Sequence, residues 1–159
     1  MVKLTIDGIQ VEAEKGTSIL HAAESVGIEV PTLCYIKDLL PDGSCRMCMV
    51  EIESRGRTKM ETACTAQVAE GLVVTTNSEK VRNARRNILD MLLSNHKTDC
   101  FSCPSNGDCK LQELCFEYGI ERTTYSGEQT ELPIDDSNKF FTYNPNLCIL
   151  CHRCVNTCH

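Results

Sequence analysis

Alternating apolar and polar residues mark several short stretches of the chain as β-strands. The pattern predicts five strands, at residues 2–6, 9–13, 49–52, 59–63 and 70–76. Two tight turns are indicated within this pattern, one at Asp7-Gly8 and one at Arg55-Gly56. They join the first strand to the second and the third strand to the fourth.

A first helix is expected between the second and third strands. Thr17 or Ser18 can cap its N-terminus, and Gly27 suits the position just beyond its end. Four apolar residues share one face at helical spacing, namely Ile19, Ala22, Ala23 and Val26. Strand, turn, strand and helix in this order predict the beginning of a β-grasp fold.

Two more helices are expected after the last strand. Asn77 or Ser78 can cap the longer one, which runs from about residue 79 to residue 93. Its expected apolar stripe consists of Val81, Ala84, Ile88, Met91 and Leu92. The shorter helix begins after Cys109 and ends at Gly119, and its expected buried face consists of Leu111, Leu114, Cys115 and Tyr118. Residues 121–144 are polar and rich in turn signals, which predicts a surface connection.

Cysteine dominates the composition, with 12 cysteines and no tryptophan in 159 residues. The small modules of this chain cannot each bury a large apolar core, so bound metal is expected to supply much of the folding free energy. Six disulfides in a secreted protein are the alternative. The N-terminus alternates like a strand and lacks the charged and apolar regions of a signal peptide. We therefore expect reduced thiols and a cytoplasmic protein.

The formal net charge of −6 gives no electrostatic footprint for a nucleic-acid-binding protein. Membrane insertion is not expected either, because no apolar run approaches transmembrane length. One basic cluster consists of Lys80, Arg82, Arg85 and Arg86. We interpret it as the solvated face of the long helix, with a docking patch as the alternative.

The first cysteine group has the spacing C-x10-C-x2-C-x15-C and consists of Cys34, Cys45, Cys48 and Cys64. A C-x2-C pair on a glycine-bearing loop, completed by two outer cysteines, suits thiolate coordination of a [2Fe–2S] cluster. Gly43 would let the backbone approach the cluster, and N–H groups of the loop would stabilise its negative charge. A zinc ribbon is the alternative, but its two C-x2-C pairs are absent.

The second group has the spacing H-x3-C-x2-C-x5-C and consists of His96, Cys100, Cys103 and Cys109. One imidazole and three thiols this close in sequence can surround a single metal centre. A structural zinc site with three cysteines and one histidine is the alternative. The neighbouring groups favour an iron–sulfur centre, because zinc passes no electrons and the three groups together suit a relay of redox centres.

The third group has the spacing C-x2-C-x2-C-x3-C and consists of Cys148, Cys151, Cys154 and Cys158. This run is typical of bacterial ferredoxins, in which three of the cysteines bind one [4Fe–4S] cluster and the fourth binds its neighbour. We expect the missing ligands, and with them a further [4Fe–4S] cluster, in sequence beyond residue 159.

Other residues that could bind metal are interpreted as ordinary side chains. Cys115 shares an apolar helix face and is expected to be a small buried residue. His21 lies on the first helix, and His152 and His159 lie within or next to the third cysteine group. None of the three histidines has ligand spacing of its own.

The three groups in this order resemble the N-terminal electron-input region of three kinds of large subunit. These belong to cytoplasmic NAD-linked formate dehydrogenases, multi-cluster [FeFe] hydrogenases and respiratory NADH dehydrogenase. The second group, together with Asp99, Gly107, Leu111 and Gln112, is the most specific part of the resemblance. The resemblance implies an α+β chain. A β-grasp [2Fe–2S] ferredoxin domain is followed by a small helical [4Fe–4S] domain and the start of a bacterial-type 2[4Fe–4S] ferredoxin domain.

The resemblance also implies ligands and boundaries. The first group would bind the [2Fe–2S] cluster, and His96, Cys100, Cys103 and Cys109 would bind the second cluster. Cys148, Cys151 and Cys154 would bind the third, and Cys158 the next. The expected boundaries are residues 1–78, 79–120, 121–144 and 145–159. The implied partners are flavin- or NAD-binding subunits, small iron–sulfur subunits and ferredoxin.

The segment from Phe140 to Val155 looks most similar to formate dehydrogenase large subunits. We therefore expect a relay that passes single electrons between a flavin or NAD subunit and a catalytic domain that interconverts formate and carbon dioxide. The same segment of an [FeFe] hydrogenase or of NADH dehydrogenase is one alternative. A complete small electron carrier without its own active site is another. The sequence shows no recognisable catalytic acid–base pair, nucleophile or substrate pocket.

Overall fold

A computed structural model describes residues 1–125 and 131–158. These residues form two compact units, of which the first contains Met1–Arg85 and the residues from His152 on. The second unit contains Arg86–Cys151. The predicted surface connection includes residues 126–130, which lie outside the described residues, whereas residues 131–143 are exposed as expected.

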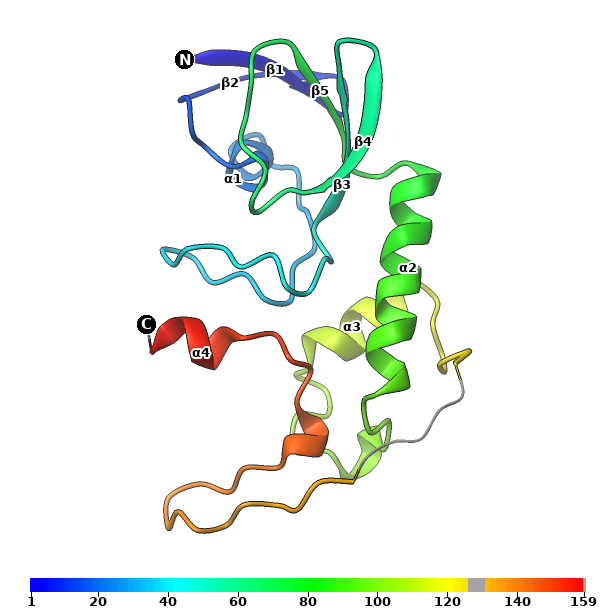
Figure 1. Ribbon diagram of the computed structural model, residues 1–159. Helices are drawn as coiled ribbons and strands as arrows, with labels where there is room; N and C mark the ends of the chain where they lie inside the picture. Colours follow the sequence, from blue (N-terminus) through cyan, green and yellow to red (C-terminus); the bar gives the residue numbers. More distant parts are fainter. Residues whose placement is uncertain (126–130, 159) are drawn as a thin grey trace. The chain divides into compact units, whose positions relative to one another are not determined.

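A five-stranded mixed sheet forms the centre of the first unit (Figure 1). Its strands are β1 (Val2–Ile6), β2 (Ile9–Ala13), β3 (Met49–Ser54), β4 (Arg57–Thr62) and β5 (Leu72–Thr75). They lie in the order β2-β1-β5-β3-β4, with β1 parallel to β5 and the other neighbours antiparallel. All five predicted strands and the predicted β-grasp arrangement are confirmed.

Both predicted hairpin turns have the expected backbone. Asp7 and Gly8 have φ values of 47° and 84°, and Arg55 and Gly56 have values of 50° and 73°. Two successive residues with positive φ are the mark of the turn type that matches the twist of a two-residue hairpin. The Asp7 carboxylate also accepts the Thr76 backbone N–H at 2.7 Å, which ties the first turn to the end of β5.

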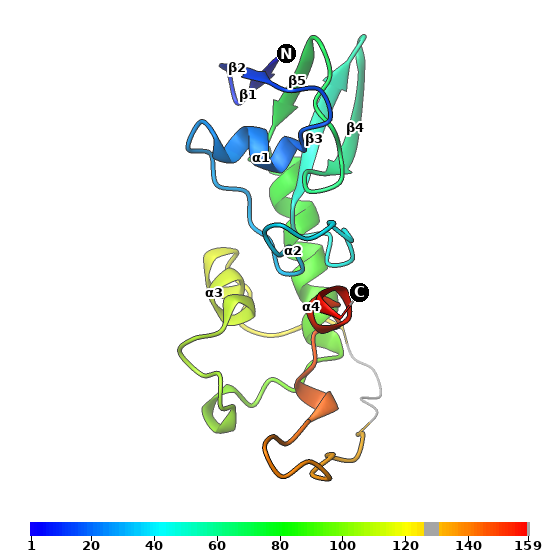
Figure 2. The same ribbon diagram turned by 90° about the vertical axis from the view of Figure 1, so that its left-hand side faces the viewer.

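The core of the first unit lies between one face of the sheet and helix α1 (Ile19–Glu24), as Figure 2 shows. Buried residues alternate with more exposed ones along β1, β2, β3 and β5, which is the period expected for a sheet with one covered face. The Ser18 hydroxyl accepts the His21 backbone N–H and caps α1 as predicted. Gly27 has the positive φ of 78° that suits the end of the helix.

Helix α2 (Glu79–Ser94) exists as predicted, but its buried face differs from the predicted stripe. Its most buried residues are Val81, Arg85, Leu89 and Leu93, a spacing of four along the helix. Met91 is 53% exposed, so its place in the stripe was wrong. The interpretation of the basic cluster as a solvated face was also wrong for Arg85, which is 3% exposed. Treating this arginine as a surface residue shifted the predicted stripe around the helix.

The second unit contains short elements around the predicted small helix. These are η1 (Cys100–Ser102), α3 (Lys110–Glu117) and η2 (Pro145–Leu147), while α4 (Arg153–Thr157) lies in the first unit. The predicted buried face of α3 is confirmed, because Leu111, Leu114, Cys115 and Tyr118 are all buried. Asp90 of α2 accepts the Thr124 backbone N–H and the Thr123 hydroxyl, both at 2.8 Å. This contact holds the segment after α3 against α2.

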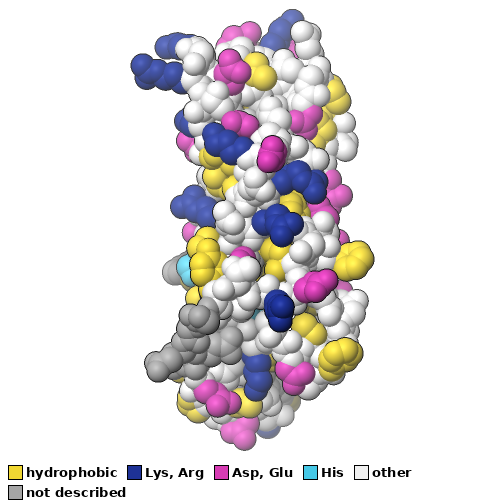
Figure 3. Space-filling model, turned by 90° about the vertical axis from the view of Figure 1, so that its right-hand side faces the viewer, with side chains coloured by type: hydrophobic (Ala, Val, Ile, Leu, Met, Phe, Trp, Pro, Cys, Tyr) yellow, Lys and Arg dark blue, Asp and Glu magenta, His cyan; other side chains and the backbone are white. Residues whose placement is uncertain are grey.

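Acidic and basic side chains are interspersed on the face of the molecule drawn in Figure 3. Such a mixed surface agrees with the modest net negative charge of the sequence. Among the helices that the structure describes, none has the length and apolar character that crossing a membrane requires.

Adjacent valines in β5 provide a test of the core. Val74 is fully buried, whereas Val73 is 42% exposed on the same strand. We predict that Val74→Ala lowers the free energy of unfolding by about 2 kcal/mol, because it removes buried carbon and leaves a cavity. Val73→Ala, the matched control, should cost under about 1 kcal/mol. Urea unfolding followed by circular dichroism measures both, and equal losses would contradict the assigned core.

Candidate metal centres

The register of the β3–β4 hairpin brings together two cysteines of the first group. Met49 pairs with Thr62, and the Ala63 backbone N–H donates to the Cys48 carbonyl at 2.9 Å. Cys48 and Cys64 therefore lie at the open end of the hairpin. Their Sγ atoms are 3.4 Å apart, within the range of an S–H···S hydrogen bond. A spacing of fifteen residues becomes a direct contact because the intervening chain is one antiparallel hairpin.

The other two cysteines of the first group meet through the loop before β3. The Cys34 backbone N–H donates to the Cys45 Sγ atom at 3.3 Å. Gly43, with φ of 68°, precedes this cysteine, and a Cβ atom there would lie 3.1 Å from the Thr65 methyl group. Arg46 also has positive φ, at 58°. The loop thus depends on one glycine that has little room for a side chain.

The pKa values show two interacting pairs of thiols. A hydrogen bond with Cys45 lowers the pKa of Cys34 to about 5, and one with Cys64 lowers the pKa of Cys48 to about 7. The pKa values of Cys45 and Cys64 are raised, chiefly by their partners. Each pair therefore readily gives up one proton and retains the other. A bound cation would offset the charge of a second thiolate in each pair.

These four thiols form one buried set. Their exposed fractions are 4%, 8%, 1% and 2% for Cys34, Cys45, Cys48 and Cys64, and charge interactions connect the two pairs. Backbone hydrogen bonds also lower the pKa of Cys45, against the larger effect of its partner. Four buried thiols, three of which also have backbone N–H groups directed at their sulfurs, fit an anionic [2Fe–2S] cluster. All twelve cysteines of the chain are free thiols.

The second group lies around a cavity of about 420 Å³ in the second unit. His96, Cys100 and Cys109 line it, together with apolar side chains such as Leu93 and Leu111. Cys103 is half-buried at the end of η1 but is not among the residues that line the cavity. The structure therefore brings three of the four predicted side chains to one space. Its imidazole and thiol lining suits a cubane cluster.

Two features organise the second group. Burial lowers the pKa of His96, which favours the neutral imidazole that can bind a metal. Gln112 accepts the Gly107 backbone N–H at 3.2 Å and donates to the Asn106 side chain at 3.1 Å. These contacts hold the loop between Cys103 and Cys109. Gly107 and Gln112 are part of the motif that the sequence singles out, and the structure gives them this role.

The third group is divided between the two units at Cys151 and His152. Its four cysteines thus have no common site within either unit. The Leu150 backbone N–H nevertheless donates to the Cys148 Sγ atom at 3.4 Å, and Leu150 has a positive φ of 53°. A bulky residue in this conformation is strained, as is common where a backbone is shaped for a ligand.

The remaining candidate side chains have other surroundings. Cys115 is buried as predicted, and burial raises its pKa to about 11. It also lines the cavity of the second group. His21 forms a hydrogen bond with the Tyr35 hydroxyl, and His152 lies 2.9 Å from the Asp42 carboxylate. Within the described part of the chain, no group of three or more His, Cys, Asp and Glu side chains is arranged to hold a metal ion. The fit to clusters therefore rests on the thiol pairs, the N–H groups and the cavity.

Gly43 offers a test of the first site. We predict that Gly43→Ala lowers the iron and acid-labile sulfide bound per chain, because the new methyl group would crowd Thr65, which directly follows Cys64. Gly56→Ala is the matched control, since its φ of 73° imposes a similar backbone strain but nothing lies within 4 Å of its Cβ position. Similar cluster contents in the two variants would show that the contact with Thr65 is unimportant.

Two family matches follow the order of these sites. Residues 1–79 match the family described as a 2Fe-2S iron-sulfur cluster binding domain. Residues 85–124 match the family described as an NADH-ubiquinone oxidoreductase-G iron-sulfur binding region. The first match includes all four cysteines of the first group, and the second includes His96 and its three cysteines.

Similar proteins are parts of oxidoreductases. The chain is 42% identical over 160 residues to a subunit of an NADH-quinone oxidoreductase of Rhizobium meliloti, covering 99% of this chain and 18% of that protein. It is 38% identical to the NADP-reducing hydrogenase subunit HndD of Solidesulfovibrio fructosivorans, over 100% of this chain and 28% of that protein. The chain thus spans less than a third of either relative.

A solved structure has the same fold. A crystal structure of an NAD+-reducing [NiFe]-hydrogenase in the H2-reduced state matches with a TM-score of 0.88 and 32% identity. The match covers 98% of this chain and 64% of that chain. Taken with the two family matches, this similarity shows that the chain belongs to the superfamily of iron–sulfur segments found in NADH dehydrogenase and hydrogenase subunits.

Proposed function

We propose that this chain is an iron–sulfur electron relay within an NAD(P)-linked oxidoreductase. The main support is the convergence of four buried thiols in the first unit. The cavity lined by His96, Cys100 and Cys109 supports a second centre. The names of the relatives, which are subunits of NADH, NADP and hydrogen-linked enzymes, support the class of reaction.

The proposed ligands follow the three groups. Cys34, Cys45, Cys48 and Cys64 would hold a [2Fe–2S] cluster, and His96, Cys100, Cys103 and Cys109 a [4Fe–4S] cluster. Cys148, Cys151 and Cys154 would contribute to a further [4Fe–4S] cluster, and Cys158 to the next. The proposed boundaries of the corresponding modules are residues 1–78, 79–120 and 145–159, with a connection at 121–144.

Bound clusters supply one-electron oxidation and reduction, and the protein controls how readily each accepts an electron. Burial of the first group excludes water from its sulfurs, and nearby backbone N–H groups stabilise negative charge there. His96 would add no negative charge to the second centre, because its imidazole is neutral when it binds metal. A cluster with a neutral ligand has a higher potential than one with thiolates alone, other factors being equal.

Formate is the substrate that we propose for the parent enzyme. The resemblance of the segment from Phe140 to Val155 to formate dehydrogenase large subunits supports it. The relatives support NADH or hydrogen as the other candidate electron donors. In each case, flavin- or NAD-binding subunits, small iron–sulfur subunits or ferredoxin would exchange electrons with the clusters. We also propose a cytoplasmic location, where thiols stay reduced and available to clusters.

Two measurements test the relay: the metal content of the chain and the change in its cluster spectra when His96 is replaced. The anaerobically purified chain should contain iron and acid-labile sulfide, with roughly ten iron atoms if three clusters form. His96→Ala should lose the electron paramagnetic resonance signal of the second centre and retain the [2Fe–2S] signal. His96→Cys should retain both, with a lower potential at the second centre, because a thiolate adds negative charge beside the iron.

Cys115→Ala is the matched control, since this cysteine lines the same cavity and is not a proposed ligand. It should reduce stability and leave the spectra unchanged. Stoichiometric zinc without sulfide would contradict the relay. Unchanged spectra in both His96 variants would exclude His96 as a ligand.

The substrate can be identified with the native enzyme that contains this chain. We predict that formate reduces a viologen dye in its presence, because electrons from a catalytic domain would pass through these clusters to the dye. Hydrogen, NADH and NADPH serve as parallel donors in the same assay. Reduction by hydrogen with no response to formate would replace formate dehydrogenase with hydrogenase.

A further inference from the structure

Among the residues that the structure describes, Arg85 is the only charged one that is buried, with 3% of its surface exposed. It lies between Val81 and Leu89 on the buried face of α2. An arginine side chain is almost never buried to this degree unless its charged group has a partner in the fold or in a binding site. Its surroundings therefore indicate what the guanidinium does.

The Arg85 side chain contacts the backbone beside the first cysteine group. Its Nη2 atom donates a hydrogen bond to the Met49 carbonyl oxygen at 2.8 Å. Met49 directly follows Cys48, and its own N–H donates to the Arg46 carbonyl at 3.2 Å, which closes the C-x2-C loop. The positive charge is thus held one residue from a proposed cluster ligand. All of these residues belong to the first unit.

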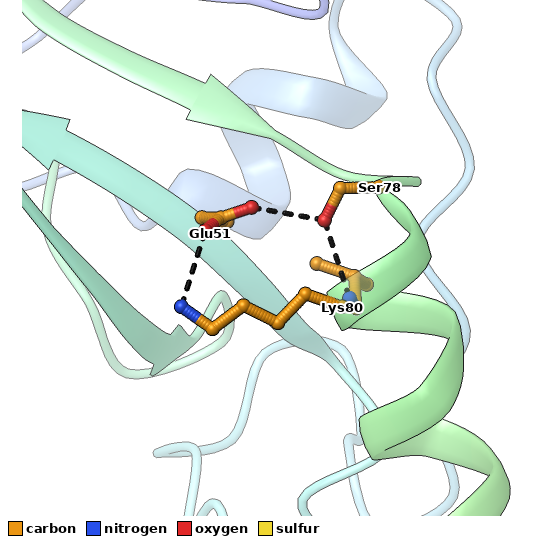
Figure 4. Close-up of polar contacts among 4 residues, drawn as sticks. Glu51, Ser78 and Lys80 are labelled. Atoms are coloured by element: carbon orange, nitrogen blue, oxygen red, sulfur yellow. Dashed lines mark hydrogen bonds and ion pairs between the residues drawn. The ribbon is translucent and has the colours of Figure 1, made fainter.

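A separate set of contacts fixes the start of α2 against β3 (Figure 4). Glu51 of β3 accepts a hydrogen bond from the Ser78 hydroxyl at 2.9 Å, and its carboxylate lies 3.2 Å from the Lys80 ammonium. The Ser78 hydroxyl in turn accepts the Val81 backbone N–H at 3.2 Å. These contacts do not involve Arg85, so they are kept in variants that remove the contact between Arg85 and Met49.

A buried cation at this position has a predictable electrostatic effect. Four thiolates and a [2Fe–2S] core carry net negative charge, and one-electron reduction adds one more negative charge. A nearby positive charge stabilises the reduced form more than the oxidised form. The effect is stronger for a buried arginine than for an exposed one such as Arg82, whose charge is screened by water and salt.

We propose that the Arg85 guanidinium, held on the Met49 carbonyl, raises the reduction potential of the [2Fe–2S] centre bound by Cys34, Cys45, Cys48 and Cys64. The inference rests on the proposed function, and it makes Arg85 a positioning residue that acts on the cluster without touching it. The first centre would consequently accept electrons from weaker reductants than the same cysteines would allow alone.

The test compares three variants in the full chain, by redox titration of the [2Fe–2S] electron paramagnetic resonance signal. Arg85→Gln removes the charge and keeps a donor for the Met49 carbonyl, so its midpoint potential should fall. Arg85→Lys keeps the charge and should have a potential close to that of the wild type. Arg82→Gln removes an exposed charge from the same helix and should change the potential less than Arg85→Gln does. Thermal unfolding of each variant separates a loss of stability from a shift in potential.

Several outcomes would overturn the proposal. The proposal fails if the midpoint potential changes no more in Arg85→Gln than in Arg82→Gln. It also fails if the midpoint potential falls as far in Arg85→Lys as in Arg85→Gln. If Arg85→Gln does not fold, the lysine variant decides the matter. Its potential should fall relative to the wild type as the pH rises from about 7 to 10, because a buried lysine loses its proton in this range. If the midpoint potentials of Arg85→Lys and the wild type change with pH in the same way, the proposal is overturned. A wild-type chain without any [2Fe–2S] signal would instead overturn the proposed function itself.

Discussion

The close packing of four buried thiols is the constraint on which the first unit depends. Cys34, Cys45, Cys48 and Cys64 are close enough to alter one another's pKa values, and each is shielded from water. Ionising all four without a cation is costly at low dielectric. The sheet, the C-x2-C loop and α1 hold the thiols together despite that cost. Iron would repay it on binding, so folding of the unit and assembly of the centre are thermodynamically coupled.

The two sites solve the problem of ligand placement differently. The first combines residues far apart in sequence, which only a formed sheet with the correct register can bring together. The second uses a short local sequence that ends α2 and begins α3, with a cavity between its side chains. Local spacing is sufficient there because fourteen residues from His96 to Cys109 can surround a cluster. Loss of tertiary structure would therefore disperse the first set of ligands more than the second.

Much of the fold could be predicted from the sequence because its signals are local. Asp7-Gly8 and Arg55-Gly56 indicate turns that need two positive φ angles, and the structure has both. The buried face of α2 could not be predicted in the same way, because an arginine such as Arg85 is usually exposed to solvent. Only the tertiary structure supplies the Met49 carbonyl that the buried guanidinium contacts. The sequence signal that could have indicated this buried face is the spacing of four residues from Val81 through Arg85 to Leu89.

The sites show the same division. The membership of each cysteine group follows from spacing, whereas the pairing of Cys48 with Cys64 follows from the hairpin register. Spacing alone also cannot show that Cys100 and Cys109 line the cavity whereas Cys103 is not among its lining residues. Cys115 could be assigned to a buried helix face from periodicity, but its place in the wall of that cavity depends on how α3 packs.

The position of Cys48 and Cys64 at the open end of a hairpin bears on how such sites diverge among related sequences. Lengthening β3 and β4 by the same number of residues moves the Arg55-Gly56 turn outward and leaves the two cysteines close together at the open end. A one-sided insertion shifts the register and points side chains to the other face of the sheet. The fifteen residues between Cys48 and Cys64 therefore measure the length of the hairpin. Their number can vary in steps of two, because each lengthening adds one residue to both strands. A search for distant relatives gains sensitivity when it fixes the symmetry of the hairpin and lets that interval change.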